Sequence, residues 1–295
     1  MREYLLGVLA VTGITLLPVL GVSLLTGFTG YFTFGHGGFM AIGAYTSAIL
    51  AKLYHLPLWL SIPAGVIAAM LSSYVIGYPT LRLKGDYFCI ATLGFGEAVR
   101  LGVENLGITG GARGLPGVAM IHNAWLPITI IAVITVILFK NLLLSRFGRT
   151  FTALREDEMA SRAIGIDTTH AKLMALAISA GLAGLGGALT AHFVGFLHPS
   201  MFGMTKSTDL TVAVIFGGVG SLTGSIIATV LLVPLPELLR AAAEWRMAFY
   251  GLAVILIMLL RPQGLFGYRE LTWESLRAFF NRKPRAHQDH LEEIT

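Results

Sequence analysis

Long apolar runs dominate this chain, and short polar stretches separate them. Five runs contain no Asp, Glu, Lys or Arg: residues 4–51, 53–81, 114–139, 173–205 and 210–236. A helix needs about 20 residues to cross a hydrocarbon core of about 30 Å, and each run is longer than that. The apolar residues are continuous rather than alternating, which favours helices over strands. We therefore predict an all-α, polytopic integral membrane bundle of about 8–10 transmembrane or broken helices.

Glycine and proline divide the runs into separate segments. The predicted segments lie near residues 4–25, 57–78, 86–106, 124–144, 173–195, 207–217, 224–240 and 247–260. The glycine-rich stretch that begins at residue 27 leads into a further helix, which ends near residue 51. Gly35, Gly37 and Gly38 weaken helix continuity, which indicates a turn or a broken helix. A second glycine turn covers 217–224. The many small residues of 173–195 predict a helix face that packs closely against its neighbours.

One polar stretch, residues 146–172, interrupts the apolar sequence. It carries nine charges, five basic and four acidic. Phe147, Phe151 and Leu154 fall at i, i+4 and i+7, which predicts an amphipathic helix with one apolar face. One alternative is a helix lying on anionic lipid, but the acidic run 156–158 would be repelled there. The balance of acidic and basic groups favours a protein partner instead.

Composition and charge agree with a membrane protein and add an orientation. Hydrophobic residues make up 55% and charged residues 13%, whereas soluble domains carry about 25% charged residues. The net charge of +5 is explained by the positive-inside rule rather than by nucleic-acid binding. We therefore expect the basic loops to share the cytoplasmic side; these are 82–84, 146–172 and 261–285. Nine full spans would place the N-terminus outside, and a re-entrant segment near 30–40 would reverse that. We expect a transmembrane domain over 1–267 and a charged cytoplasmic tail over 268–295.

Few side chains offer chemistry. The single Cys89 excludes an intrachain disulfide and a cysteine metal site, and we expect no metal site. The chain lacks a glycine loop followed by Lys-Ser or Lys-Thr, so we expect it to bind no ATP and no other cofactor itself. Polar groups within a membrane tend to face the bundle interior. The candidates for lining a translocation path are His36, Thr92, Glu97 and Thr109.

Two of these candidates also have a purely structural interpretation. His36 can be a packing histidine satisfied by a hydrogen bond. Glu97 can pair with Arg100, which follows it at i+3.

At the polar stretch the chain resembles a known family. The stretch 147–166 is similar to the cytoplasmic coupling loop of ABC importer permeases for branched-chain amino acids. Four further stretches match the same family in the same order: 35–45, 85–97, 217–224 and 261–267. The resemblance covers about residues 20–267 and is closest to the M-type subunit.

The resemblance implies an assembly and a set of coupling residues. A related H-type permease subunit would pair with this chain in a bacterial inner membrane. Two ATPase subunits carrying ATP and Mg would bind on the cytoplasmic side. A periplasmic or lipid-anchored binding protein would deliver the solute. Transport would proceed by alternating access. The residues expected to couple to the ATPase are Gly148, Arg149, Ala153, Arg155, Glu156, Asp157, Glu158, Ala160 and Gly165.

Two other functions stay open from the sequence. Related permeases carry urea or short amides, and apolar walls with a few hydroxyls suit those solutes as well. The other alternative is an ion-coupled secondary transporter that uses Glu97 with His36 or His192, and it leaves residues 146–172 without a role.

Overall fold

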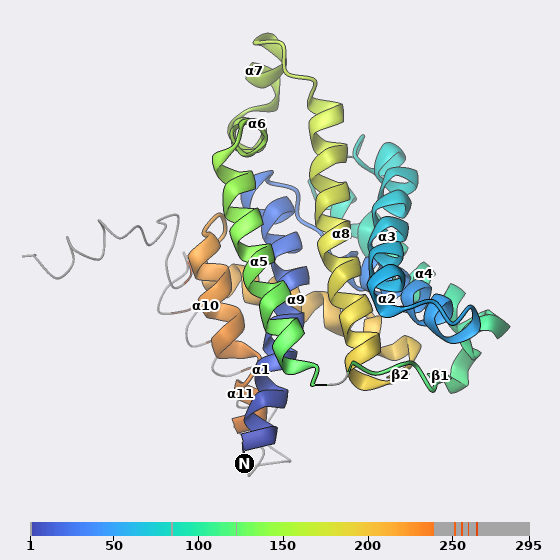
Figure 1. Ribbon diagram of the computed structural model, residues 1–295. Helices are drawn as coiled ribbons and strands as arrows, with labels where there is room; N and C mark the ends of the chain where they lie inside the picture. The colour runs from blue at the N-terminus through green and yellow to red at the C-terminus, as the bar shows by residue number, and fades with distance from the viewer. Residues whose placement is uncertain are drawn as a thin grey trace, which may run out of the picture.

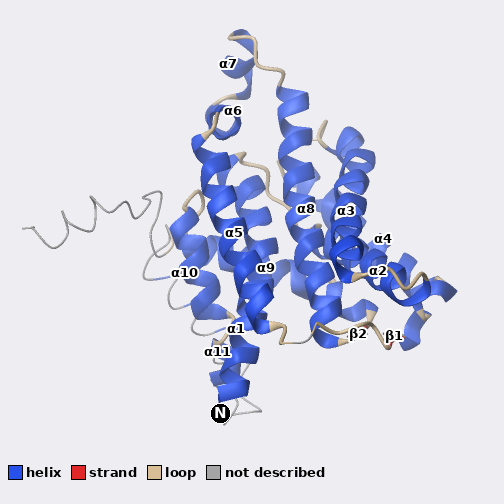
Figure 2. Cartoon of the chain, in the orientation of Figure 1, coloured by secondary structure: helices blue, strands red, loops and turns tan. Residues whose placement is uncertain are grey.

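The computed structural model describes residues 2–83, 85–121 and 123–238, and the single positions Gly251, Ile255, Leu259 and Gly264. Apart from those four positions, the predicted segment 247–260, the loop 261–285 and the tail 268–295 lie outside the described residues. The described part is a helical bundle (Figures 1 and 2) with one short antiparallel strand pair. The prediction of an all-α membrane bundle is confirmed.

Four helices of the described chain are long and apolar enough to cross a membrane. They are α1 (Arg2–Val22) with its π-helical continuation η1 (Ser23–Phe28), α3 (Leu58–Thr80), α5 (Trp125–Leu144) and α8 (Thr168–Val194). The chain is therefore a multi-pass membrane protein. The predicted start of the last of these spans, residue 173, was too late, because the Asp167 side chain accepts a hydrogen bond from the His170 amide and so caps a longer helix.

Shorter elements complete the bundle. The helices are α2 (His36–Leu53), α4 (Asp86–Asn105), α9 (Met204–Gly217), α10 (Leu222–Leu232) and α11 (Leu235–Leu238). At the end of the molecule opposite α7, a small cluster is formed by η2 (Gly107–Thr109), η3 (Gly111–Arg113), β1 (Leu115–Pro116), β2 (Phe196–Leu197) and η4 (Pro199–Phe202).

Helices α2, α3 and α8 pack through their small residues. A Cβ atom on Gly43 of α2 would lie 2.5 Å from the Cα atom of Gly184 in α8. A Cβ atom on Gly65 of α3 would lie 2.5 Å from the carbonyl oxygen of Gly43. The predicted close-packing face of α8 is thus confirmed, since three backbones approach to a distance that only glycine allows.

The first glycine-rich stretch forms a broken helix. The helix of α1 and η1 ends at Phe28, an irregular segment follows, and α2 begins at His36. A Cβ atom on Gly35 would lie 2.7 Å from the carbonyl oxygen of Thr92, and one on Gly38 would lie 2.9 Å from the Cα atom of Gly96. These glycines therefore allow the start of α2 to pack against α4.

The N-terminus lies at the end of the molecule opposite to α6 (Arg146–Glu156) and α7 (Glu158–Ala163), as Figure 1 shows. With the basic loops on the cytoplasmic side, this arrangement agrees with the alternative that places the N-terminus outside.

Candidate coupling segment and translocation path

The polar stretch folds into two short helices joined by a cap. Ser145 accepts a hydrogen bond from the Phe147 amide at the start of α6, and Asp157 accepts from the Met159 and Ala160 amides at the start of α7. Phe151 and Leu154 are buried, as an amphipathic helix requires. Phe147 was expected on the same apolar face but is 51% exposed, because it lies in the first turn of α6, next to the end of α5.

Glu158 is the centre of an internal ion-pair cluster. Its Oε1 atom lies 2.6 Å from the Lys172 Nζ atom and 2.7 Å from an Arg162 nitrogen. The Tyr31 hydroxyl donates to its Oε2 atom over 3.2 Å. Burial of Glu158 opposes its ionisation, but Lys172, Tyr31 and Arg162 together outweigh this, so the pKa of the carboxyl is lowered from its usual value.

Arg155 also points into the molecule. Its Nη1 atom donates to the Gly27 carbonyl oxygen over 2.7 Å. A Cβ atom on Gly220, between α9 and α10, would lie 2.5 Å from the same nitrogen. A Cβ atom on Gly27 would in turn lie 2.8 Å from the Gly220 amide nitrogen. Arg155 thus joins α6 to the place where η1 meets the second glycine turn.

The nine expected coupling residues therefore divide into two groups. Those turned inward or half-buried are Gly148, Ala153, Arg155 and Glu158, and those exposed are Arg149, Glu156, Asp157, Ala160 and Gly165. Gly165 has φ = +89°, which favours glycine. Sequence reasoning missed Met159 and Ile164, which are 80% and 76% exposed. The signal available in the sequence was the presence of these two apolar residues among charged ones, which indicates an exposed apolar contact.

Three of the four path candidates make hydrogen bonds within the chain. The His36 Nε2 atom lies 2.6 Å from the Ser179 hydroxyl, and Thr92 accepts from the Phe34 amide and donates to the Cys89 carbonyl. Thr109 donates to two carbonyls at the end of α4. His36 and Thr92 come together at the broken helix, whereas Thr109 lies apart from them, beyond the end of α4. Their role in transport stays a prediction.

Glu97 connects α4 to α9. It accepts from the Arg100 Nε atom over 2.7 Å and from the Met204 amide over 2.9 Å, and Arg100 also pairs with Glu104 at 2.9 Å. The predicted pairing of Glu97 with Arg100 is confirmed. Because Met204 begins α9, the Glu97 carboxylate also neutralises the positive end of that helix.

These charged residues and two more on α9 form a polar strip, which consists of Glu97, Arg100, Glu104, Lys206 and Asp209. Lys206 is half-buried and Asp209 is exposed, one turn further on. Sequence reasoning used Lys206 only to mark the end of an apolar run and did not single out Asp209. Two ionisable residues three positions apart in an apolar helix were the signal, since intramembrane charges are costly and usually functional.

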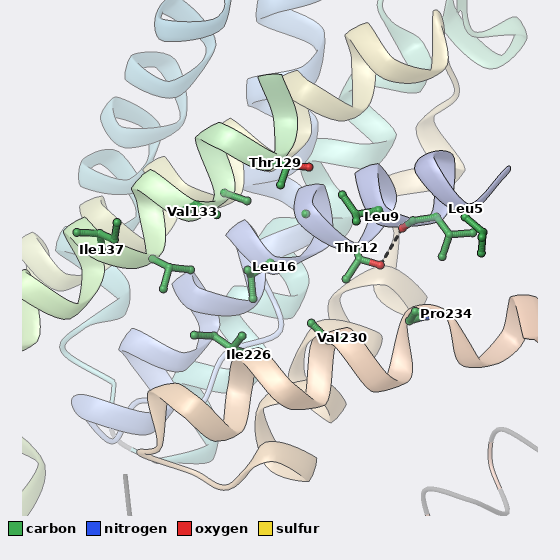
Figure 3. Close-up of a pocket in the computed structure, with 14 residues that line it drawn as sticks. Leu5, Leu9, Thr12, Leu16, Thr129, Val133, Ile137, Ile226, Val230 and Pro234 are labelled. Atoms are coloured by element: carbon green, nitrogen blue, oxygen red, sulfur yellow. Dashed lines mark hydrogen bonds between the residues drawn. The ribbon is translucent and has the colours of Figure 1, made fainter. Parts of the chain in front are cut away.

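An apolar groove lies between α1, α5 and α10 (Figure 3). Its volume is about 610 Å³, and its lining includes Leu9, Leu16, Val133 and Val230. The Thr12 hydroxyl in this groove donates to the Val8 carbonyl of its own helix over 2.8 Å. The groove offers apolar surface to lipid or to another helix, and we do not assign it to a path for a zwitterion.

Comparison with known proteins identifies the family. Residues 4–260 match the family described as "Branched-chain amino acid transport system / permease component". The permease proteins LivM of Salmonella typhimurium and of Escherichia coli K12 are each 36% identical over 280 residues, which is 83% of this chain and 66% of the relative. LivH of Escherichia coli K12 is 26% identical over 287 residues, covering 86% of this chain and 92% of that relative.

The chain thus spans about two thirds of the length of its LivM relatives, 66%. No solved structure shows a significant match to it. The family match over most of the chain agrees with the helical membrane fold and with the ordered motifs noted in the sequence. The chain belongs to the family of permease components of branched-chain amino acid transport systems.

Proposed function

We propose that this chain is a permease subunit of an ABC importer in a bacterial inner membrane, and that it moves branched-chain amino acids by alternating access. The relatives named for high-affinity branched-chain amino acid transport support the cargo. ATP and Mg would bind to two separate ATPase subunits and not to this chain. A second, LivH-like permease would complete the pathway, and a periplasmic or lipid-anchored binding protein would deliver the solute.

The observation that carries this proposal is the two-sided construction of α6 and α7. Their outer surface presents Met159 and Ile164 beside the acidic Glu156 and Asp157. An apolar patch with a charged rim is typical of a protein interface. We define these four residues as the docking surface and assign it to the ATPase.

The inner side of the same segment supplies the connection to the transmembrane helices. Arg155 reaches Gly27, and Glu158 reaches Lys172 of α8 and Tyr31. A displacement of α6 and α7 by the ATPase would therefore act directly on η1, on the broken helix and on α8. These elements pack so closely through glycine that they would move as units.

The polar strip fits the cargo. A branched-chain amino acid presents an ammonium, a carboxylate and an apolar side chain. We propose that the strip, formed by Glu97, Arg100, Glu104, Lys206 and Asp209, faces the path shared with the second permease and guides the zwitterion between alternating charges. A neutral solute such as urea gains little from such a strip, so the urea and amide alternative is less well supported. A stand-alone ion-coupled transporter would leave the docking surface without a partner.

The test separates docking from transmission. Met159→Asp with Ile164→Asp should lower co-purification of the ATPase at least about tenfold, because two apolar anchors become charged. Arg155→Met should retain the ATPase but lower ATP-driven leucine uptake. Met120→Asp is the matched control, since Met120 is 68% exposed at the opposite end of the molecule. Undiminished ATPase binding by the double variant would rule out the docking surface.

A further inference from the structure

A polar cavity lies where the ends of α3 and α8 meet α7. Its volume is about 280 Å³. Tyr78 and Arg82 line it from the end of α3 and the turn after it, Arg162 from α7, and Thr169 and Lys172 from the first turns of α8. Glu158 lies at its inner wall. The cavity shares no lining residue with the docking surface or with the polar strip.

The cavity carries a net positive charge. Three cations, Arg82, Arg162 and Lys172, line it together with one carboxylate, Glu158. Lys172 is 6% exposed and is bonded to that carboxylate at 2.6 Å, so this pair is neutral. The charges of the two arginines are then left to attract an anion.

Both arginines retain unused donor groups. Arg82 lies over the Tyr78 ring at 5.0 Å and makes no ion pair with any residue that the structure describes. Arg162 donates to Glu158 and, through Nε, to Thr168. Its Nη1 group makes no hydrogen bond within the described ranges. Arginine nitrogens in such a fork match the oxygens of a phosphate group.

The position of the cavity identifies the carrier of that phosphate. Arg82 follows the last residue of a 23-residue apolar helix by two positions. Tyr78, one turn earlier, is 60% exposed. Tyrosine and arginine at the end of a span mark the level of the lipid headgroups, on the side that the positive-inside rule makes cytoplasmic. Leu81 and Leu173 add apolar surface to the lining, which suits the glycerol and first acyl carbons of a lipid.

We propose that this cavity binds the phosphate headgroup of an anionic glycerophospholipid, between Arg82 of the α3 turn and Arg162 of α7. Basic pockets between transmembrane helices on the cytoplasmic side bind such headgroups. The bound lipid would fasten α7 to α3 and so would stabilise the segment that carries the docking surface. The site depends on the orientation of the chain in the membrane and not on its cargo.

The test measures lipid binding by the full chain purified in detergent. Native mass spectrometry and thermal unfolding are recorded with phosphatidylglycerol, with phosphatidylcholine and with inorganic phosphate. Phosphatidylglycerol should remain bound and raise the unfolding temperature, whereas the other two should not. Arg82→Gln with Arg162→Gln should weaken phosphatidylglycerol binding about tenfold or more, because two charge-assisted contacts are lost.

Two controls keep this test decisive. Arg149→Gln removes an exposed arginine of α6 that does not line the cavity, and it should bind phosphatidylglycerol like the wild type. Arg82→Gln alone changes an exposed side chain outside the ion-pair cluster, so it should fold normally and still bind less lipid. The proposal is overturned if both arginine variants bind phosphatidylglycerol like the wild type, or if inorganic phosphate alone reproduces the thermal shift.

Discussion

At the residue scale, Glu158 shows that a residue predicted to couple to an ATPase can also make contacts inside the chain. The sequence placed it among the residues that contact the ATPase. In the structure it faces Lys172, which is 6% exposed and needs a counter-charge because a lone buried ammonium is costly. Glu158 is therefore a structural connection between α7 and α8, and its contact with an ATPase stays a prediction.

Removing the Glu158 charge should destabilise the protein. Glu158→Gln leaves Lys172 without its ion-pair partner, and we expect the free energy of unfolding to fall by about 1.5–3 kcal/mol. Glu156→Gln is the matched control, because Glu156 is exposed and makes no ion pair in the described chain; its effect should stay within about 0.5 kcal/mol. Chemical unfolding of both variants in the same detergent measures the difference, and equal stability of the two would contradict the ion-pair account.

The same carboxyl should give a pH signature. Its pKa is lowered in the folded protein, so its stabilising effect is fully present above the pKa of an unfolded glutamate, about 4.3, and is lost as the pH falls through the lower folded pKa. The stability difference between wild type and Glu158→Gln should be constant near neutral pH and should shrink in acid. A difference that grows as the pH falls would mean that the pKa of this carboxyl is raised in the folded protein, which would contradict the ion-pair account.

Residue contacts were predictable only where they are local. Glu97 and Arg100 are three positions apart on one helix, so helical geometry alone brings them together. Glu158 and Tyr31 are 127 positions apart, and no periodicity in the chain relates them. The same reason explains why the inward contact of Arg155 was not predicted, since its acceptor is the backbone carbonyl of Gly27 on a distant element.

At the scale of elements, the apolar runs specified the spans well because each run must cover the thickness of a bilayer. The small residues of α8 also predicted close packing, but not which helices it contacts. Those partners, α2 and α3, are set by the fit of Gly43, Gly65 and Gly184. The start of α8 was misplaced because hydropathy detects the apolar part of a helix and not its polar first turn, which Asp167 caps.

The glycine contact between α2 and α8 gives a prediction at this scale. Gly43→Ala places a methyl group 2.5 Å from the Gly184 Cα atom, and we expect a loss of about 1–3 kcal/mol in unfolding free energy from overpacking. Gly102→Ala in α4 is the matched control, because its Cβ atom would meet nothing within 4 Å; it should be neutral or stabilising by up to about 1 kcal/mol. Thermal unfolding of the two variants checks this, and similar midpoints would contradict the close packing.

At the scale of the whole molecule, three features are arranged along the membrane normal. The docking surface lies at one end, the polar strip begins toward the other, and the glycine-packed helices connect them. The fold class and family could be inferred from the sequence. The inward orientation of Arg155 and Glu158, and the position of Asp209, required the structure because they depend on how distant helices pack.

In the proposed assembly, the energy source lies outside the chain. We expect the docking surface to be the point at which an ATPase acts, and the strip to be the part of the path that this chain contributes. Transport should then need every subunit of the proposed assembly.

The most direct measurement is leucine uptake into proteoliposomes with defined subunits. The chain assembled with a LivH-like permease, its ATPases and the binding protein should take up leucine only when ATP is present, and Met159→Asp with Ile164→Asp should abolish that uptake while the permease still inserts. Leucine uptake by this chain alone, or uptake by the double variant equal to the wild type, would contradict the account.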